Sequence, residues 1–547
     1  MNHFMLRIRH GLFAAGTVLT FVVLANRAMS VPESPSIPAS AWPMFHGNER
    51  HTGVASGQGN ISKTRGPVPR WKFRVFDQPA SGDLASYRWT SSFPLGDLDG
   101  DGVLDIVVTT PDTNAITPTL GGQPAPHRVI ALKDAPGQTP PYRVMWIYTS
   151  TLPAGGPGLD TYSPALADAD GDGKLDVIFT GRDGFVRALK GTTGQVLWEF
   201  NTNRLMEAGP IVADLDGNGT LEAIVVTDCR TGVVCPNPND QAYLFVLPVT
   251  GTGTLTAPLW SLVYPFKLDS AVPAVADLDP GDGQNRKAII MGTWGGELLV
   301  AWRNAGGLVV TNSLRLRELD HSIPTLDAPP VIRSSPLVWN WGEGETIVFG
   351  WLPSDLNASD ARVSAVGATA DMAAGTVSFT SRWITKTYDV WKSSPALIPR
   401  TGLSSLAVMG YGLGVQQPDQ SGPVGRCDPQ YVTGGVVAFT QNGFVEWGHN
   451  FGNIEGNIRA SAASADLDGD GRTEVILPTG CYGKLHAYDG LTGAEEWTVQ
   501  LGPLTQGSPS VGDIVGNGKL EIVVGSYDGN VWVLGSGSQV YLPAVQR

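Results

Sequence analysis

The sequence predicts an all-β fold built from eight repeated four-stranded units, and three observations lead to this prediction. The composition favours turns, with 68 glycines and 40 prolines among 547 residues, and only 16% of the residues are charged. Short apolar segments that open with a serine or glycine near a proline recur along the chain, and acidic nine-residue loops follow several of them. No long segment has the 3.6-residue apolar period of a helix, so we expect strands and turns.

The apolar segments count the units. Each is expected to form the first strand of a unit, and consecutive segments start about 46 to 71 residues apart, enough for four antiparallel strands and their loops. Tandem units of this size are typical of the blades of a β-propeller. We therefore expect eight blades, with seven as the alternative. The eight segments occupy residues 92–97, 163–168, 209–214, 272–277, 335–340, 394–399, 461–466 and 508–513.

Tryptophans with the same period mark the strand expected at the outer edge of each blade. The unit near residues 306–315 lacks one, and the last unit ends three strands in, after residues 531–534. An unassigned strand with Trp71 (PRWKFRV) precedes the first unit, so we expect it to complete the last blade and remove two exposed sheet edges. The tryptophans are expected to pack between blades. Six units carry one: Trp146, Trp198, Trp260, Trp383, Trp447 and Trp497.

Four acidic loops predict calcium sites. Oxygen-bearing side chains occupy loop positions one, three, five and nine, while glycines at positions four and six let the backbone curl around a centre. Six to eight oxygen ligands suit calcium, whose charge also offsets the repulsion between carboxylates. We therefore predict about four Ca²⁺ ions, held by Asp97, Asp99, Asp101 and Asp105; Asp168, Asp170, Asp172 and Asp176; Asp214, Asp216, Asn218 and Glu222; and Asp466, Asp468, Asp470 and Glu474.

Two other interpretations of these loops explain less. An EF-hand needs a glutamate at position twelve and flanking helices, but position twelve is apolar in all four loops and a strand-like segment follows. Simple Asp-Gly turns would not require an acidic residue at position nine four times. A degraded copy with Asp277, Asp279 and Asp282 is a weaker metal candidate, and the copy at residues 513–521 is expected to bind none because Val515 replaces a ligand.

The chain begins with a segment expected to direct export. A basic start, an apolar run over residues 11–25 and a small-x-small cleavage site at residues 28–30 are typical of a secretory signal, with an uncleaved anchor as the alternative. No later segment is expected to cross a bilayer, so we predict a secreted, cell-surface or periplasmic protein. The predicted division is a signal peptide at 1–30, a Pro/Ser-rich spacer and N-terminal extension at 31–64, the propeller at 65–536 and a tail at 537–547.

Four cysteines in an exported chain are expected to form disulfides. Cys229 and Cys235 bracket a short loop, which favours a local bridge. Cys427 and Cys481 would then form a bridge between neighbouring blades. Free buried thiols are the alternative.

The acidic loops and the blade period resemble FG-GAP or VCBS-type propeller repeats, which are related to the integrin α-subunit head. The resemblance implies that the ions stabilise blades and seldom take part in chemistry. It also adds a backbone carbonyl ligand at loop position seven. In this sequence those carbonyls belong to Val103, Lys174, Thr220 and Arg472.

Residues 42–48 (WPMFHGN) and 50–53 (RHTG), with the Thr-Gly turns before Trp198 and Trp497, resemble pyrroloquinoline-quinone-type propellers. For the enzymes of that group, the resemblance implies eight blades and a calcium-bound quinone beside a disulfide between adjacent cysteines. No two cysteines are adjacent here, and the acidic loops are not the cofactor site of those enzymes. The shared segments are therefore expected to be packing elements, which non-enzymatic relatives also contain.

The sequence favours a non-enzymatic module that binds an extracellular protein or glycan. No set of nucleophile, base and oxyanion donors can be assembled from it. The net charge of −14 would become about −6 with four calcium ions, and no basic patch indicates a nucleic-acid partner. Loop insertions are the expected contact surfaces. They span residues 111–142, 228–241, 353–376 and 413–432.

Two enzymatic alternatives remain, and the oligomeric state is not predicted. The first is a polysaccharide lyase-like enzyme on a calcium-rich propeller, and the second is a quinone-dependent dehydrogenase. The lyase would need basic and acidic side chains gathered on the axial face. Its possible members are His321, Arg333, Lys392 and His449.

Overall fold

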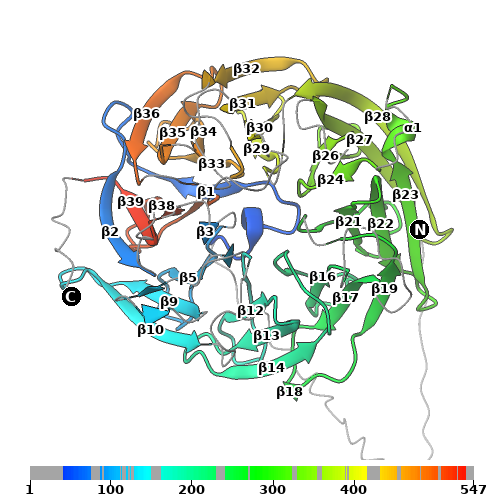
Figure 1. Cartoon of the computed structure of the whole chain (residues 1–547), viewed down its shortest axis with the longest axis horizontal. Coiled ribbons are helices and arrows are strands. Elements are labelled where there is room, and N and C mark those ends of the chain that lie inside the picture. Colours follow the sequence, from blue (N-terminus) through cyan, green and yellow to red (C-terminus); the bar gives the residue numbers. More distant parts are fainter. Residues whose placement is uncertain are drawn as a thin grey trace, which may run out of the picture. The chain divides into compact units, whose positions relative to one another are not determined.

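Eight antiparallel sheets are arranged in a ring in the computed structural model of the chain, which confirms the predicted all-β, eight-bladed propeller (Figure 1). Residues Ser34–Arg547 form one compact unit. The structure describes residues 41–75, 87–88, 92–110, 112–113, 119–120, 123–124, 128–149, 162–229, 241–268, 271–322, 329–353, 360–387, 390, 393–414, 432–452, 458–480, 482–502, 505, 507–526 and 528–537.

Each predicted apolar segment forms the innermost strand of one blade. Blade 1 consists of β4 (Leu95–Gly96), β5 (Asp105–Thr109), β9 (Arg128–Asp134) and β10 (Tyr142–Thr149). Blade 2 consists of β11 (Ala165–Ala167), β12 (Asp176–Thr180), β13 (Phe185–Leu189) and β14 (Val196–Asn201), with β18 (Gly253–Thr254) added outside. Blade 3 consists of β15 (Ile211–Ala213), β16 (Glu222–Val226), β17 (Ala242–Pro248) and β19 (Trp260–Tyr264). Blade 4 consists of β20 (Ala274–Ala276), β21 (Ala288–Gly292), β22 (Glu297–Arg303) and β23 (Val309–Arg315).

The second half of the ring follows the same order. Blade 5 consists of β24 (Val331–Ile332) and β25 (Leu337–Asn340), both paired with β26 (Glu345–Leu352), then β27 (Ala361–Asp371) and β28 (Thr376–Thr387). Blade 6 consists of β29 (Ala396–Ile398), β30 (Leu406–Gly414), β31 (Val432–Phe439) and β32 (Val445–Asn450). Blade 7 consists of β33 (Ala463–Asp466), β34 (Glu474–Pro478), β35 (Lys484–Asp489) and β36 (Glu495–Gln500). Blade 8 consists of β37 (Ser510–Gly512), β38 (Glu521–Ser526), β39 (Asn530–Gly535) and β2 (Val68–Arg74).

The remaining elements are short. Two small strand pairs are formed by β3 (Tyr87–Arg88) with β6 (Asp112–Thr113) and by β7 (Thr119–Leu120) with β8 (Gln123–Pro124). The named helical turns are η1 (Phe45–Gly47) and α1 (Leu316–Leu319). Within the described ranges, no helix has the length and hydropathy needed to span a bilayer.

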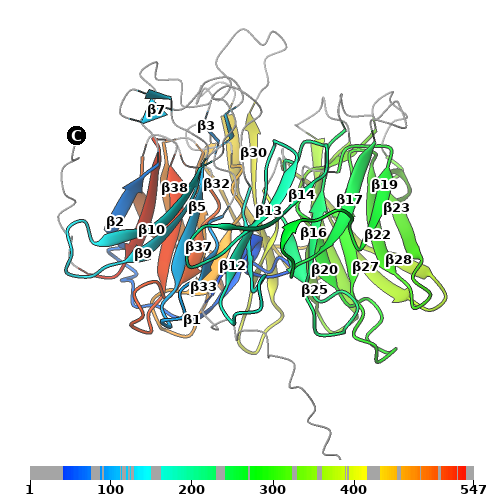
Figure 2. The same cartoon turned by 90° about the horizontal axis from the view of Figure 1, so that it is seen from below.

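The N-terminal strand closes the ring as predicted. Strand β2 pairs antiparallel with β39, so Trp71 lies opposite Val533 in the last blade. Antiparallel pairing alternates the connections between the two ends of the ring, which Figure 2 shows from the side. One end carries the connections between the first and second strands and the turns between the third and fourth; the other end carries the remaining connections.

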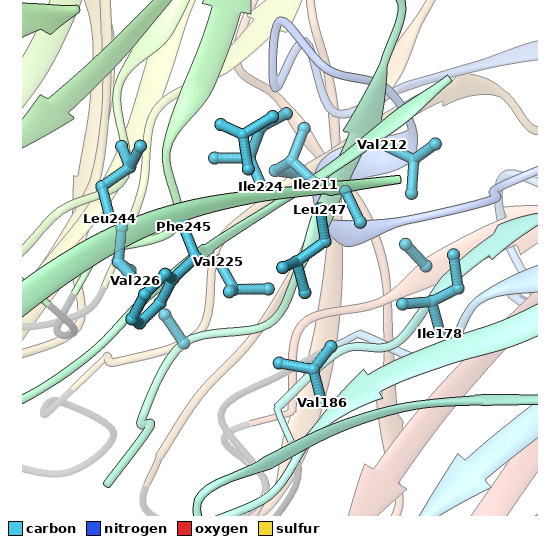
Figure 3. Close-up of a cluster of buried hydrophobic side chains, with 14 of the residues drawn as sticks. Ile178, Val186, Ile211, Val212, Ile224, Val225, Val226, Leu244, Phe245 and Leu247 are labelled. Atoms are coloured by element: carbon cyan, nitrogen blue, oxygen red, sulfur yellow. The ribbon is translucent and has the colours of Figure 1, made fainter. Parts of the chain in front are cut away.

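The hydrophobic core lies between neighbouring blades. Figure 3 shows Ile178 and Val186 of blade 2 in one buried cluster with strands β15, β16 and β17 of blade 3. The second strands read DIVVT, DVIFT and EAIVV in the first three blades, and all of these residues are buried. Apolar side chains on both faces suit a blade that is covered by a neighbour on each side.

The outer-strand tryptophans pack on the next blade, as predicted. The indole N–H of Trp198 donates to the carbonyl of Val249 (2.7 Å), and that of Trp447 donates to the carbonyl of Gly490 (3.0 Å). Both acceptors lie in the turn between the third and fourth strands of the following blade. Blade 4 lacks the tryptophan on its outer strand. There, Trp302 on the third strand β22 takes the role and donates to Met372 of blade 5 (3.4 Å).

The recurring serine of the first-strand segments links consecutive blades. The buried hydroxyl of Ser163 accepts the backbone N–H of Ser92 at 2.9 Å, and four further serines do the same for the blade before them. Glycine replaces the serine in blade 3, because a Cβ at Gly209 would lie 2.2 Å from the Ser163 carbonyl oxygen. The four further hydroxyl acceptors, at 2.9 to 3.0 Å, are Ser335, Ser394, Ser461 and Ser508.

Residues 42–58, named here the axial segment, lie inside the ring of blades (Figure 1). They include η1 and β1 (Val54–Gln58), and β1 runs parallel to β33. Backbone hydrogen bonds join the segment to blades 1, 2, 4, 5, 6, 7 and 8, for example from Leu397 N–H to Thr52 O (2.7 Å) and from Ser464 N–H to Gly53 O (2.8 Å). The described part of the predicted spacer is therefore packed within the propeller, on its axis side.

Two of the predicted insertions are wrong in part. Residues 128–134 form β9 and residues 361–371 form β27, so part of each predicted insertion, 111–142 and 353–376, is third strand. Strand β27 (ARVSAVGATAD) is rich in small residues, which suggest a loop when only the sequence is considered. All of its residues except two are buried in the structure, because small side chains allow the blades to pack closely. The insertions 228–241 and 413–432 lie mostly outside the described residues.

Candidate functional site

The four acidic loops all connect the first and second strands of a blade. They belong to blades 1, 2, 3 and 7, so the blade topology places them at the same end of the ring. In each loop the apolar residue at position two is buried, the residues at positions three to seven are half-buried or exposed, and position nine begins the buried second strand. Each candidate site is therefore built within a single blade.

The carboxylate at position one organises each loop. In blade 1, Asp97 accepts backbone N–H bonds from Gly100 (2.6 Å), Asp101 (3.1 Å) and Gly102 (2.8 Å). Gly100 and Gly102 have φ values of 80° and 86°, a left-handed conformation that favours glycine. The bonds from the two glycines recur at Asp168, Asp214 and Asp466.

The carboxylate at position nine closes the loop from the buried side. Asp105 accepts the N–H of Leu98 (2.9 Å), and its equivalents accept the same N–H of their own loops at 2.6 to 2.9 Å. Burial raises the pKa of Asp105 to about 7 and that of Glu474 to about 8. Burial also raises the pKa of Asp176 to about 6 and that of Glu222 to about 7. A cation beside these carboxylates would favour their ionised forms.

The structure brings acidic oxygens together in all four loops, within 4.8 Å of one another. One buried oxygen of these groups, Oε1 of Glu474, accepts no hydrogen bond from the described residues. Convergent oxygens with unused lone pairs fit a hard divalent cation such as calcium. The groups are Asp97, Asp99 and Asp101; Asp168, Asp170 and Asp176; Asp214, Asp216 and Glu222; and Asp466, Asp468 and Glu474.

Some predicted ligands lie outside these groups. Asp105, Asp172 and Asp470 belong to the loops but do not join the converging sets, and Asn218 accepts the N–H of Thr220 (2.7 Å). The carbonyl ligands implied at position seven stay predictions, as do the identity and number of the ions.

The two degraded loops are held by protein contacts. In blade 4, Asp282 pairs with Arg286 (2.6 Å), and Asp279 accepts the N–H of Met372 from blade 5 (2.9 Å). In blade 8, Asp513 accepts the N–H of Gly518 (2.7 Å) although Val515 replaces the second ligand. The loop shape therefore persists without a full ligand set.

Of the four predicted disulfide cysteines, Cys229 lies among the described residues and is disulfide-bonded. Cys235, Cys427 and Cys481 lie outside the described residues, so the predicted pairing is not tested.

The opposite end of the ring carries a second group of side chains, here called the charged cluster: Arg182, Glu207, Asp228, Lys267, Trp294 and Arg333. Lys267 Nζ lies 2.6 Å from Asp228 Oδ2 and 3.4 Å from Glu207 Oε2. Arg333 lies over the Trp294 ring, 4.3 Å from its centroid. Burial raises the pKa of Asp228, and Lys267 opposes that shift. These residues come from connections of blades 2 to 5.

The proposed lyase residues are placed differently. Arg333 belongs to the charged cluster, whereas His449 lies on the outer strand β32 and stacks on Tyr488 of blade 7, with ring centroids 4.6 Å apart. His321 is exposed beyond α1, and Lys392 lies outside the described residues. The described residues thus do not assemble the proposed set.

No family model and no curated protein matches the chain. Among solved structures, it is similar to the quinohemoprotein alcohol dehydrogenase from Comamonas testosteroni, with 13% identity over 93% of this chain and 82% of that chain and a TM-score of 0.53. It is also similar to a europium-containing methanol dehydrogenase (13% identity, 91% and 98% coverage, TM-score 0.50) and to Sqt1 from Saccharomyces cerevisiae (10%, 86% and 100%, 0.50). At these identities the likeness shows the β-propeller fold alone, so membership of the FG-GAP or VCBS group stays a prediction.

Proposed function

We propose that this chain is an exported calcium-binding propeller that acts without catalysis, as a binding module for an extracellular protein or glycan. The observation that carries the calcium part is the repeated convergence of carboxylate oxygens in four loops of one design. Because each loop joins two strands of one blade, calcium there would stabilise the blade. This role leaves the opposite end of the ring for ligand binding.

The charged cluster supports binding at that opposite end. An aromatic ring flanked by two cations, with two carboxylates beside them, offers stacking and charged hydrogen bonds, which suit an acidic sugar or an acidic protein segment. We expect an acidic oligosaccharide to bind the full-length protein in isothermal titration calorimetry. Arg333→Met should weaken that binding, whereas Lys386→Met, on an exposed side chain of blade 5, should not. Equal loss of binding in both variants would contradict a site at the cluster.

Calcium binding is tested by unfolding. The purified protein is heated with millimolar calcium and again with excess chelator, and its metal content is measured. When the free calcium concentration is 100 times the dissociation constant of a site, binding at that site stabilises the fold by about 2.7 kcal/mol. Several such sites should therefore raise the melting temperature clearly. Protein that contains no calcium and melts at the same temperature in both buffers would refute the calcium proposal.

The dehydrogenase alternative rests on fold likeness. Under our proposal, protein incubated with pyrroloquinoline quinone and then passed through gel filtration should retain no quinone absorbance. It should also show no dye-linked alcohol oxidation. Quinone retained through gel filtration together with alcohol oxidation would favour the enzyme instead.

A further inference from the structure

Lysine ammonium groups from outside the loops lie at three of the four candidate calcium sites. In blade 1, Lys133 Nζ lies 2.8 Å from both carboxylate oxygens of Asp99, 2.6 Å from Asp101 Oδ2 and 3.8 Å from Asp105 Oδ1. The Lys133 side chain is only 11% exposed. The ammonium therefore faces three of the four predicted side-chain ligands of that loop.

Blades 2 and 7 have the same arrangement. Lys190 contacts Asp170 and lies 2.8 Å from Asp172 Oδ2. In blade 7 the cation comes from elsewhere in the chain, because Lys63, between β1 and β2, lies 3.1 Å from Asp468 Oδ2 and 2.7 Å from Asp470 Oδ2.

The strand register explains which loops receive a lysine from their own blade. On the third strand, the residue opposite loop position nine is Lys133 in blade 1 and Lys190 in blade 2. Each follows directly from the neighbouring pair of the antiparallel ladder, Ile106–Leu132 in blade 1 and Val177–Leu189 in blade 2. In blade 3 the residue opposite Glu222 is Pro248, which carries no charge.

Blade 3 is therefore the exception. Among the described residues, no lysine, arginine or histidine forms an ion pair with Asp214, Asp216 or Glu222, and the charges that act on Glu222 come from the two aspartates. Its three carboxylates converge without a protein cation, so backbone N–H groups, water or a bound ion must offset their mutual repulsion.

We propose that these lysines grade the calcium affinity of the four loops, so that the blade 3 loop binds calcium most tightly. This inference rests on the proposed calcium sites. In blades 1, 2 and 7 the lysine serves as a counter-ion that offsets part of the loop's negative charge without calcium and repels the incoming divalent cation. A unit charge about 5 Å from a divalent ion, even in a medium as polar as water, changes affinity by roughly tenfold.

The test is a calcium titration of the full-length protein with a competing fluorescent chelator, which resolves sites of different affinity. The wild type should show one tight site and weaker sites. Lys133→Met and Lys190→Met should each strengthen one weak site by roughly tenfold, because the aliphatic stem stays and the charge is lost. Asp216→Asn should weaken the tight site selectively.

Two variants control for charge and for folding. Lys133→Arg keeps the positive charge and should keep the weak site weak, whereas Lys386→Met removes a charge far from the loops in sequence, near Asp360, and should change no site. Circular dichroism in chelator selects the variants that fold; Lys190, with a more exposed side chain, supplies the second measurement if Lys133→Met does not fold.

The outcomes separate the two proposals. Strengthening of one site by each lysine variant supports the grading. Calcium binding that is unchanged by both variants, or loss of a weak site in Asp216→Asn, overturns the grading but leaves the calcium sites. A protein and variants that bind no calcium overturn both.

Discussion

Acid is expected to destabilise this propeller through two buried histidines of the axial segment. His46 Nδ1 lies 3.3 Å from the His51 carbonyl oxygen, and His51 Nδ1 lies 3.0 Å from the Pro336 carbonyl oxygen. Since a carbonyl can only accept, each Nδ1 carries the proton and both rings can be neutral. Burial lowers the pKa of His46 to about 4 and, with the neighbouring His46 charge, that of His51 to about 3.

The sign and size of the effect follow from these values. Well above their unfolded pKa of 6.5, both histidines are neutral in the folded and unfolded states and contribute nothing to pH dependence. Below pH 6.5 the unfolded chain binds protons that the folded protein does not, so stability falls with pH until the folded values are reached. At pH 5 each histidine lowers the free energy of unfolding by about 2 kcal/mol, and the pair by about 4 kcal/mol.

The perturbation is replacement of both histidines by asparagine. His46 and His51 have φ values of 54° and 56°, which asparagine tolerates, and its amide nitrogen replaces the Nδ1 donor. Wild type and the double variant are unfolded in denaturant between pH 7.5 and pH 5 in calcium buffer. Between pH 7.5 and pH 5, the unfolding free energy of the wild type should fall by about 4 kcal/mol more than that of the double variant. Relative to a single variant, the difference should be about half as large.

The comparison removes an opposing effect. The raised pKa values of Asp105 and Glu474 favour folding at low pH and lose that effect as the pH rises through about 7 and about 8, but they act equally in both proteins. Exposed His321, replaced by asparagine, is the control. If the wild-type and double-variant curves stay parallel down to pH 5, the histidines are not buried neutral groups and the reasoning fails.

Two further predictions concern the contacts between blades, both measured by denaturant unfolding. Ser394→Ala should lower stability by about 1 to 3 kcal/mol, because the buried N–H of Ser335 loses its acceptor; unchanged stability would contradict the serine link. Gly493→Ala should destabilise more than Gly137→Ala, since both have left-handed φ but only the Cβ at 493 would lie 2.6 Å from the Trp447 ring. Equal losses would show that backbone strain alone acts.

The repeats made most of the ring predictable. Most first-strand segments combine a serine or glycine, a proline and apolar residues, and in five of the eight the serine links the segment to the preceding blade. The position of Trp71 before the first unit was enough to predict closure, since a blade with three strands needs a fourth. Acidic residues at fixed loop positions likewise predicted the groups that converge.

The rest depended on contacts that leave no local pattern. The axial segment bonds to blade after blade through its backbone, so its side chains show no period. Trp302 replaces an outer-strand tryptophan from a different strand, and Lys63 reaches Asp470 from a distant part of the chain. The charged cluster draws its members from connections of several blades, which only the assembled ring brings together.

Ring closure also constrains how the chain folds. Arg74 of β2 pairs with Asn530 of β39, so the first strand of the ring to be synthesised has no partner until nearly the whole chain is available. Contacts this distant in sequence form slowly, and an open strand edge can meanwhile pair with another chain. Strand β2 reads VPRWKFR. Its proline and three basic residues are those that discourage edge-to-edge pairing, so the strand that waits longest is also protected against aggregation.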